Sequence, residues 1–334
     1  MSINFTHNKN TVATPWHIAE LLTEYFDAGN KRTFDPTAGI GSFLQYTRQP
    51  YGIEYDTSAY ERLQESLPDG HFVHGSLFEQ TDWIKAQNIE VVLMNPPFNQ
   101  PKELMPKEYS EQFGKKGADS TKGLWWVQFV ADTVGSGRLA AIIPTSCGGT
   151  GKKAIDQVKA ELLKRHTLDA VLSFNNELFY PGASVGTICM IFTLGKPHTG
   201  KTLFINCTDD GLIKDRTQGR IDKDNKWADI KQEWLHILQE KIDAPKQTEG
   251  HICSAYKEVT DTDSWTPSSH WEYDLTPTDE DFKKTVRDYM DWRISQIGLQ
   301  AFLDENPHLK PTKEEQKQKI QRQIAVLQAR LEQL

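Results

Sequence analysis

Hydrophobic and polar positions alternate in blocks along the chain between residues 33 and 195. Short apolar runs are followed by longer stretches in which apolar residues recur every three or four positions. This order is typical of an α/β protein with a parallel sheet and helices between the strands. It predicts seven strands, enough for a doubly wound sheet. They are expected at residues 33–35, 51–54, 72–73, 91–94, 139–143, 170–174 and 186–194.

The fourth apolar run, residues 91–94, leads directly into Asn95-Pro96-Pro97-Phe98. A run without polar alternation is typical of a parallel strand buried on both faces. The two prolines end strand pairing and stiffen the backbone just beyond the strand. Ligands of open α/β sheets bind at the carboxyl ends of the strands, so this turn is a candidate site. The alternative is that the prolines only stop the strand.

The remaining segments are read from the same patterns. Thr14-Pro15 is expected to cap a helix with a buried stripe formed by Ile18, Leu21, Leu22, Tyr25 and Phe26. Residues 99–123 are polar and poorly periodic, so they predict a long loop. Beyond residue 197 we expect a strand at 202–206, a charged loop to about 226, a helix near 230–242 and a loop region with Trp265 and Trp271.

The last sixty residues are predicted to be helical and highly charged. Apolar positions spaced by four, three, four and three residues form a coiled-coil seam, and they are Ile320, Ile324, Leu327, Leu331 and Leu334. Two heptads are too short to be stable alone. This helix therefore either packs on its own domain or binds a partner.

The composition indicates a soluble protein with room for a sizeable core. Of the 334 residues 37% are hydrophobic and 25% charged, and no stretch approaches the roughly 20 apolar residues that cross a bilayer. The N-terminus lacks the apolar core of a signal peptide, so we expect a cytoplasmic protein without a membrane partner. The four cysteines include no CxxC pair, which argues against a zinc ribbon and a disulfide framework. A net charge of -8 means that a DNA substrate would require local basic patches or a second subunit.

Three strand ends upstream of Asn95 carry residues suited to a nucleotide-like ligand. Gly39 and Gly41 lie in the turn from the first strand toward an expected helix, where glycines allow close backbone approach. Glu54 ends the next strand, and its carboxylate can accept hydrogen bonds from two ribose hydroxyls. Gly75, Ser76 and Leu77 follow the third strand, beside the place for an adenine ring. A plain turn and a surface acid are the alternatives for the glycines and for Glu54.

The turn at Asn95 suits a reaction at an aromatic amine. Such an amine is a poor nucleophile because its lone pair is delocalised into the ring. The Asn95 side-chain oxygen and the Pro96 carbonyl can accept hydrogen bonds from both of its N–H groups and so localise the lone pair toward an incoming methyl group. Phe98 can stack on the base, which must be flipped out of a duplex to reach this site.

The segments TPWHIAELL, DPTAGIGSF, YGIEYD, HGSLF and NPPF, in this order, resemble the adenine-N6 DNA methyltransferases that use S-adenosylmethionine. Later segments, among them GRLAAIIPTS, KTLFIN and SSHWEYDLTP, resemble the modification subunits of type I restriction-modification systems, so the resemblance covers about residues 11–275. It implies a Rossmann-like class I methyltransferase fold with a seven-stranded sheet and a helical C-terminal extension. The implied parts are a catalytic domain over 1–200, its family-specific extension over 201–275 and a helical, partner-binding tail over 276–334.

The resemblance also implies a role for each matched residue. Asn95, Pro96, Pro97 and Phe98 would hold the target base as the catalytic residues. The cofactor-binding residues would be Thr14 and Pro15 at the methionine end, Asp35, Thr37, Ala38, Gly39 and Gly41 along the amino-acid side, Glu54 at the ribose, Ser76 and Leu77 at the adenine, and Asn95. No metal is implied.

Two departures from the family pattern are visible. Ser76 stands where the family often has an acidic residue, which would weaken the contact to the cofactor's adenine amine or leave it to the backbone. The chain also lacks the large N-terminal helical domain common in these subunits. One alternative, left open by Ser76, is an inert methyltransferase-like scaffold or sensor in a defence complex. The other is an amino-methyltransferase acting on RNA bases or on glutamine side chains of proteins, because Asn-Pro-Pro followed by an aromatic residue also serves those reactions.

The implied partners are double-stranded DNA, a specificity subunit that reads the sequence, and possibly a restriction subunit. Local lysines are candidate phosphate contacts, namely Lys102, Lys107, Lys115, Lys116, Lys122, Lys152 and Lys153. Trp125 and Trp126 begin an apolar-periodic segment, which favours core packing over base stacking.

Overall fold

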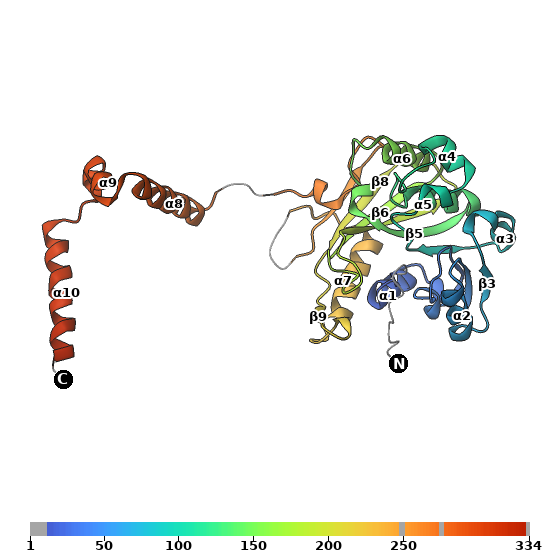
Figure 1. The fold of residues 1–334 in the computed structure, drawn as a ribbon, viewed down its shortest axis with the longest axis horizontal. Helices are drawn as coiled ribbons and strands as arrows, with labels where there is room; N and C mark the ends of the chain where they lie inside the picture. Colours follow the sequence, from blue (N-terminus) through green and yellow to red (C-terminus); the bar gives the residue numbers. More distant parts are fainter. Residues whose placement is uncertain (1–11, 247–250, 274–276, 332–334) are drawn as a thin grey trace. The chain divides into compact units, whose positions relative to one another are not determined.

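A computed structural model describes residues 12–246, 251–273 and 277–331, and the chain divides into two compact units, Met1–Tyr273 and Asp274–Leu334. In the described part of the first unit, nine strands form one sheet in the order β11-β8-β6-β7-β5-β4-β1-β2-β3 (Figure 1). The strands are β1 (Arg32–Asp35), β2 (Gln49–Glu54), β3 (His71–His74), β4 (Val91–Met94), β5 (Gly137–Pro144), β6 (Thr167–Phe174), β7 (Thr187–Leu194), β8 (Lys201–Cys207) and β11 (Ser254–Glu258). A separate hairpin consists of β9 (Ile213–Asp215) and β10 (Gly219–Ile221).

All seven predicted strands are present as β1 to β7, so the prediction of a mixed α/β fold with a mostly parallel sheet is confirmed. Strands β3, β2, β1, β4 and β5 pair in parallel, and β7 lies antiparallel between β5 and β6. Beyond β6, β8 adds a parallel strand and β11 an antiparallel one. The helices of this unit are α1 (Trp16–Tyr25), α2 (Thr57–Ser66), α3 (Thr81–Ala86), α4 (Lys107–Phe113), α5 (Leu124–Val134), α6 (Lys153–Arg165) and α7 (Trp227–Glu240).

Strand β4 shows why its apolar run has no polar alternation. Val92 and Met94 point into a core formed with α3, α5 and α6, whereas Val91 and Leu93 point into a second core formed with α1 and α7. Figure 1 shows these two groups of helices on opposite faces of the sheet. Burial of each such side chain is worth about 1.5–3 kcal/mol, so both faces fix the strand in place.

The N-terminal helix differs from the prediction at its cap. Its stripe Ile18, Leu21, Leu22 and Phe26 is buried as expected, with Tyr25 half-buried. However, α1 begins at Trp16 with Pro15 as N-cap, and no side chain caps it. Thr14 does not cap the helix because it lies one residue before the N-cap.

The turn after β1 leads into no α-helix. Residues 36–48 include Gly39 and Gly41, both with positive φ, and only a short 3-10 turn, Leu44–Tyr46. Two glycines and Pro36 leave too few helix-forming residues for a stable α-helix before β2 begins. The expected strand-to-helix turn is therefore a strand-to-strand connection.

Three segments predicted as loops contain regular structure. Residues 99–123 include a 3-10 turn, Lys102–Leu104, and α4. The charged segment before residue 226 contains the β9–β10 hairpin, and the region around Trp265 contains β11 and the 3-10 turn Pro267–His270. Strand β11 was missed because its hydrogen bonds come from β8, which is distant in the sequence, whereas β9 and β10 have only three residues each and are too short to show a period. The strand at 202–206 and the helix near 230–242 are confirmed as β8 and α7.

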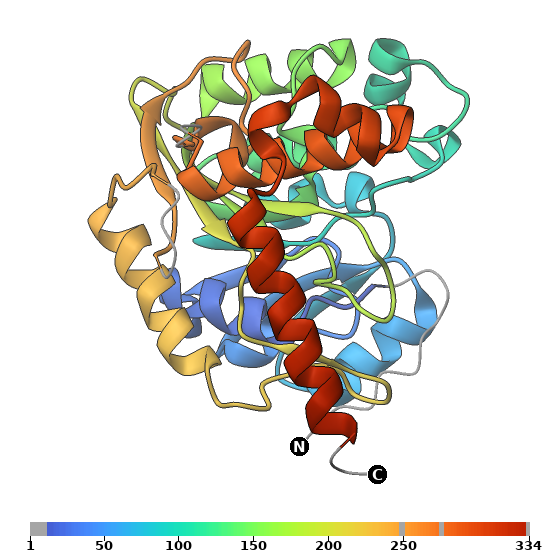
Figure 2. The ribbon, with the colours of Figure 1, turned by 90° about the vertical axis from the view of Figure 1, so that its left-hand side faces the viewer.

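The second unit is helical, as predicted. It consists of α8 (Asp279–Ile297), α9 (Leu299–Glu305) and α10 (Lys313–Leu331), the last a single straight helix in Figure 2. Thr278 and Asp281 form a reciprocal capping box at the start of α8. Among the described side chains of this unit, Phe302 is the one hydrophobic residue that is buried.

No helix in the described residues combines the length and apolarity needed to span a bilayer.

Candidate functional site

The predicted site residues gather at the carboxyl edge of the sheet. Strand β1 pairs with β2 on one side and β4 on the other, and β3 follows β2. Asp35, Glu54 and Asn95 therefore end or follow three neighbouring parallel strands. The chain changes direction of winding at β1 and β4, which is where open α/β sheets bind ligands.

The glycine turn is closed by Glu54. Its Oε2 accepts a hydrogen bond of 2.7 Å from the amide of Gly39, and its Oε1 accepts one of 2.7 Å from the amide of Asp56. The amide of Ala38 donates to the carbonyl of Ile53 over 3.0 Å. Each carboxylate oxygen has a second acceptor direction. Glu54 thus fixes the glycine turn by these hydrogen bonds, and its carboxylate can accept further hydrogen bonds from a ligand.

Gly41 is required by packing. Its φ is 86°, and a Cβ atom there would lie 2.9 Å from Cδ1 of Leu63. A side chain at this position would be strained by the positive φ and would require the end of the Leu63 side chain to shift.

Asp35 is buried and carries a raised pKa. Burial raises the pKa of Asp35 to about 7; hydrogen bonds from Thr37 oppose this shift, and the nearby charge of Glu54 adds to it. Oδ1 of Asp35 accepts from the amide of Thr37 over 2.9 Å. A buried carboxylate beside a second carboxylate favours a positively charged ligand, because a cation offsets both the burial and the repulsion.

Asn95 joins two other segments of the site. Its Nδ2 donates to the carbonyl of Val12 over 3.3 Å and to Oγ1 of Thr14 over 3.4 Å. Its backbone carbonyl accepts from Oγ1 of Thr37 over 3.4 Å. Pro15 follows Thr14 and begins α1. The structure thus brings together Thr14, Thr37 and Asn95, which are far apart in the sequence.

The third strand end is placed less directly. The amide of Gly75 donates to the carbonyl of Glu54 over 2.9 Å, which brings this turn beside the second strand end. Leu77 is buried in the core, and half-buried Ser76 caps no helix with its side chain. The side chain of Leu77 therefore packs in the core beneath this turn, and a ligand at this strand end would contact Ser76.

Sequence reasoning missed Asp119, which organises the segment after the Asn-Pro-Pro-Phe turn. This buried carboxylate accepts from the hydroxyl of Tyr109 over 2.6 Å, from the amide and hydroxyl of Thr121 over 2.7 Å each, and from the amide of Gly123 over 2.8 Å. The Asp-Ser-Thr sequence, with Thr two residues after Asp, is a local turn signal that identifies this role.

Gly123 places the end of that segment against the prolines. It has φ 93°, and a Cβ atom there would lie 3.3 Å from the carbonyl oxygen of Pro97 and 3.4 Å from Cγ of Pro96. Asp119 therefore fixes the segment that packs on the turn. Trp125 and Trp126 begin α5 behind it and are buried, as predicted.

The lysines near this turn separate into two groups. Lys102 is buried, and its Nζ donates to the carbonyl of Phe113 over 2.7 Å, so the expectation that it faces DNA is wrong. Lys122 donates to Oδ1 of Asn99 over 2.7 Å, and Lys107 pairs with Glu111. The exposed lysines that remain are Lys115, Lys116, Lys152 and Lys153.

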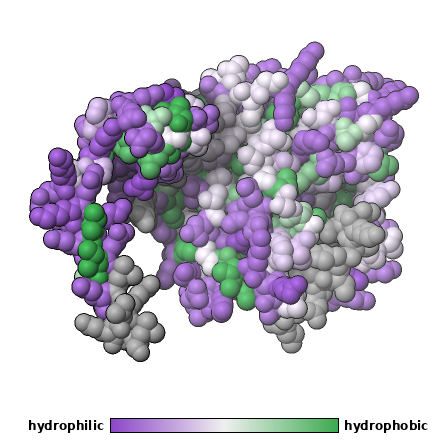
Figure 3. Space-filling view, turned by 60° about the vertical axis from the view of Figure 1, so that its left-hand side comes forward, coloured by the Kyte–Doolittle hydropathy of each residue, from purple (hydrophilic) through white to green (hydrophobic). Residues whose placement is uncertain are grey.

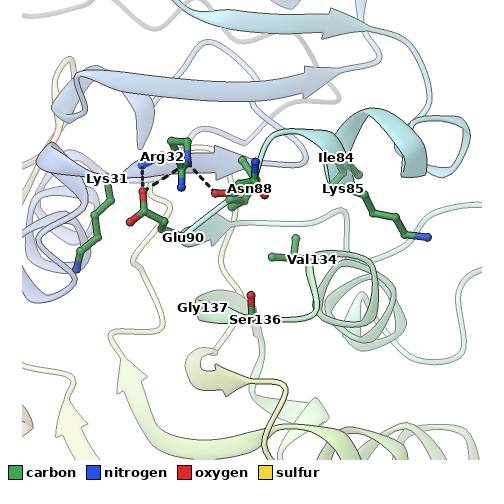
Figure 4. A pocket seen from close by; sticks show the side chains of 10 residues that line it. Lys31, Arg32, Ile84, Lys85, Asn88, Glu90, Val134, Ser136 and Gly137 are labelled. Atoms are coloured by element: carbon green, nitrogen blue, oxygen red, sulfur yellow. Dashed lines mark hydrogen bonds and ion pairs between the residues drawn. The ribbon is translucent and has the colours of Figure 1, made fainter.

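A hollow of about 490 Å³ lies at the opposite, amino-terminal edge of the sheet (Figure 4). Arg32 is in it, but its Nε donates to the carbonyl of Asn88 over 2.7 Å and lies 3.6 Å from Glu90. Arg32, Asn88 and Glu90 in this hollow therefore already interact with one another. Within the described ranges, no group of three or more His, Cys, Asp or Glu side chains is arranged to hold a metal ion.

Comparisons with known proteins agree with this fold. Residues 4–264 match the model of the family described as N-6 DNA Methylase. The chain is 27% identical over 314 residues to the type II restriction enzyme and methyltransferase RM.BcgI of Heyndrickxia coagulans, covering 85% of this chain and 46% of the relative. The chain thus spans about half the length of this curated relative.

Solved structures with the same fold include two from type I systems. The methyltransferase subunit from Streptococcus thermophilus superposes with a TM-score of 0.52 at 22% identity, over 71% of this chain and 56% of that one. The EcoKI M protein superposes with a TM-score of 0.52 at 15% identity, over 93% of this chain and 75% of that one. The match over residues 4–264 shows that the chain belongs to the N-6 DNA Methylase family, and its fold is like that of type I modification subunits.

Proposed function

We propose that this chain transfers a methyl group from S-adenosylmethionine to N6 of an adenine flipped out of double-stranded DNA, together with a separate specificity subunit. The single observation that supports this most is the convergence of Asp35, Glu54 and Asn95 at one sheet edge in a chain of this family.

The residues at the edge fit a cationic nucleoside cofactor. S-adenosylmethionine supplies an electrophilic methyl group on a sulfonium and carries an ammonium. Burial raises the pKa of Asp35 to about 7, and the positive ammonium would stabilise its ionised carboxylate. Glu54 would accept the ribose hydroxyls with its remaining acceptor directions. Thr14, Pro15, Thr37, Ala38, Gly39, Gly41, Ser76 and Leu77 would border the remaining parts.

The Asn-Pro-Pro-Phe turn would hold the adenine. Oδ1 of Asn95 and the carbonyl of Pro96 accept the two N6 hydrogens, which localises the amine lone pair for attack on the methyl carbon. The proton leaves after the C–N bond has formed, so no strong base is needed. Pro97 keeps the turn rigid, and half-buried Phe98 stacks on the ring.

The parts of the chain would divide this work. Residues 1–200 carry the reaction, residues 201–275 support the catalytic domain, and residues 276–334 bind the specificity subunit. Aromatic and apolar side chains lie exposed on α8 and α10, where Tyr289 is 58%, Trp292 55% and Ile320 56% exposed. Figure 3 shows hydrophobic residues, in green, exposed among the hydrophilic residues of this unit. Ile324 is also exposed, whereas Leu327, Leu331 and Leu334 lie outside the described side chains. An exposed apolar face with a heptad pattern suits a helical partner.

DNA binding would depend on that partner for most of its attraction. The net charge of -8 opposes phosphate binding. Lys115, Lys116, Lys152 and Lys153 would supply local contacts. A restriction subunit is a further partner consistent with this arrangement.

Two measurements on purified protein and its Asn95→Ala variant test the proposal. Calorimetry should detect S-adenosylmethionine binding by both proteins with similar affinity. In the presence of the specificity subunit, transfer of labelled methyl to unmethylated bacterial DNA should fall by at least about a hundredfold in the variant, the range for loss of a preorganised transition-state contact. Wild-type protein that binds no cofactor would favour the inert scaffold, and label found in RNA or protein instead of DNA would favour the other amino-methyltransferases.

A further inference from the structure

The amide of Asn95 has a defined orientation. Its side chain approaches the carbonyl oxygen of Val12 at 3.3 Å and Oγ1 of Thr14 at 3.4 Å. A peptide carbonyl oxygen only accepts hydrogen bonds, so the amide atom that faces it must be the NH2 group. The opposite atom, Oδ1, therefore points away from residues 12–14.

This orientation decides whether Asn95 helps or hinders the reaction. The exocyclic amine of adenine presents two hydrogens and needs acceptors. An amide rotated by 180° would present its NH2 group, and two donors would face each other. We propose that Thr14, with the Val12 carbonyl, is a positioning residue that keeps Oδ1 of Asn95 turned toward the base. This inference rests on the proposed function.

Thr14 is well placed to hold an orientation because it is itself fixed. Its side chain is buried, and the rigid Pro15 joins it to α1. Helix α1 is covered by α7, where Nε1 of Trp227 donates to Glu20 over 2.8 Å and Lys231 pairs with Glu20 at 3.0 Å. The position of Thr14 therefore depends on residues more than two hundred positions later in the chain.

Buried polar contacts add to this support. His17 on α1 lies 3.3 Å from Asp210, which pairs with Arg220 of β10. All three side chains are buried. Removal of one member of a buried charged group is costly, so the helix has little freedom to shift. The segment after β8 thus supports the amino end of α1 and, through it, Thr14.

The backbone of Asn95 is held separately. Its carbonyl accepts from Oγ1 of Thr37, and Thr37 in turn donates to Asp35. Removal of the Thr14 hydroxyl would therefore leave the side-chain amide held by the Val12 carbonyl alone, while the turn stays in place. Loss of one hydrogen bond of ordinary strength corresponds to a rate decrease of about three- to tenfold.

The test compares Thr14→Val, which keeps the shape and removes the hydroxyl, with Thr14→Ser, which keeps the hydroxyl. Thr23→Val is the matched control, because Thr23 is a buried threonine of α1 whose hydroxyl donates to the carbonyl of Ala19, away from the site. Cofactor affinity is measured by calorimetry and the methyl-transfer rate by single turnover on unmethylated bacterial DNA, with the specificity subunit present. The Asn95 side-chain amide is observed by NMR of protein labelled with 15N-asparagine and assigned by its loss in Asn95→Ala.

The expected result in Thr14→Val is a three- to tenfold lower rate that clearly exceeds any loss of cofactor affinity. Thr14→Ser should recover most of the lost rate, and the Asn95 amide signal should shift in Thr14→Val alone. A loss of cofactor affinity equal to the loss of rate would overturn the inference, because Thr14 would then act on the cofactor. An unshifted amide signal, or no recovery with serine, would also overturn it. Wild-type protein that transfers no methyl contradicts the proposed function, whereas the NMR comparison tests the Thr14 contact without any substrate.

Discussion

The raised pKa of Asp35 predicts that cofactor affinity depends on pH. With a pKa of about 7, the carboxyl is mostly protonated at pH 6 and mostly ionised at pH 8. A ligand that carries an ammonium binds the ionised form, so the fraction available falls about tenfold between pH 8 and pH 6. The association constant for S-adenosylmethionine should fall by about the same factor, or about 1.4 kcal/mol. Calorimetric titrations at pH 6, 7 and 8 measure this directly.

Asp35→Asn is the matched control, because it keeps the shape and cannot ionise. Any titration of the ligand itself affects both proteins, so the difference in slope isolates Asp35. We expect weaker binding at pH 8 and little pH dependence in the variant. The account of Asp35 would be refuted by equal slopes in the two proteins, or by wild-type affinity that rises toward pH 6.

The same shift has a consequence for the stability of the ligand-free protein. The folded pKa of Asp35 lies above its ordinary value of 3.8, so the folded state binds the proton more tightly than the unfolded state. The stabilising contribution is complete below about pH 4 and is lost as the pH rises through 7. At pH 8, Asp35→Asn should therefore be more stable than wild type, by up to about 4 kcal/mol. Urea unfolding at pH 5 and pH 8 measures this, and a less stable variant at pH 8 would argue against a raised pKa.

Three further predictions concern the support of the site and the partner. Asp119→Ala should lower the free energy of unfolding in urea titrations by about 3–5 kcal/mol, because it leaves several buried donors without an acceptor. The control Ser120→Ala, at the exposed neighbouring residue, should change it by less than about 0.5 kcal/mol. Gly123→Ala introduces a strained φ and a Cβ against the prolines, so it should cost about 1–2 kcal/mol and slow methyl transfer without weakening cofactor binding in calorimetry; an unchanged rate would show that this packing is unimportant. Trp292→Ala together with Tyr289→Ala should weaken association with the specificity subunit in size-exclusion titrations while cofactor affinity stays constant, and undiminished association would exclude α8 as the docking face.

Much of the fold could be predicted because the strands carry their own signal. The run at β4 is apolar on both faces, and the structure buries both, so periodicity alone identified it. Strand β11 carried no such signal, since it pairs with β8, which only the folded chain brings near, and the β9–β10 hairpin was missed because its strands have three residues each. The connection after β1 contains glycines and a proline that disfavour helix, which is why it forms a short 3-10 turn and not the expected α-helix.

The candidate site was predictable in its residue types and less so in its contacts. Strand ends identified Asp35, Glu54 and Asn95, because parallel strands deliver their carboxyl ends to one edge. The contact between Thr14 and Asn95 spans 81 positions and depends on how α1 packs, which no local pattern encodes. Burial decided the role of Asp119 and removed Lys102 from the surface. Both outcomes depend on tertiary packing and could not be read from charge alone.

Identification of the methylated product tests the central claim most directly. The chain, expressed with its neighbouring genes in a host that lacks adenine methylation, should place N6-methyladenine in the host DNA, as measured by mass spectrometry of digested nucleosides. The Asn95→Ala variant, at equal expression, should leave that nucleoside at background. N6-methyladenine at equal levels in both strains, or a methyl group found only on another base, would contradict the claim that the Asn95 turn directs methyl transfer to adenine.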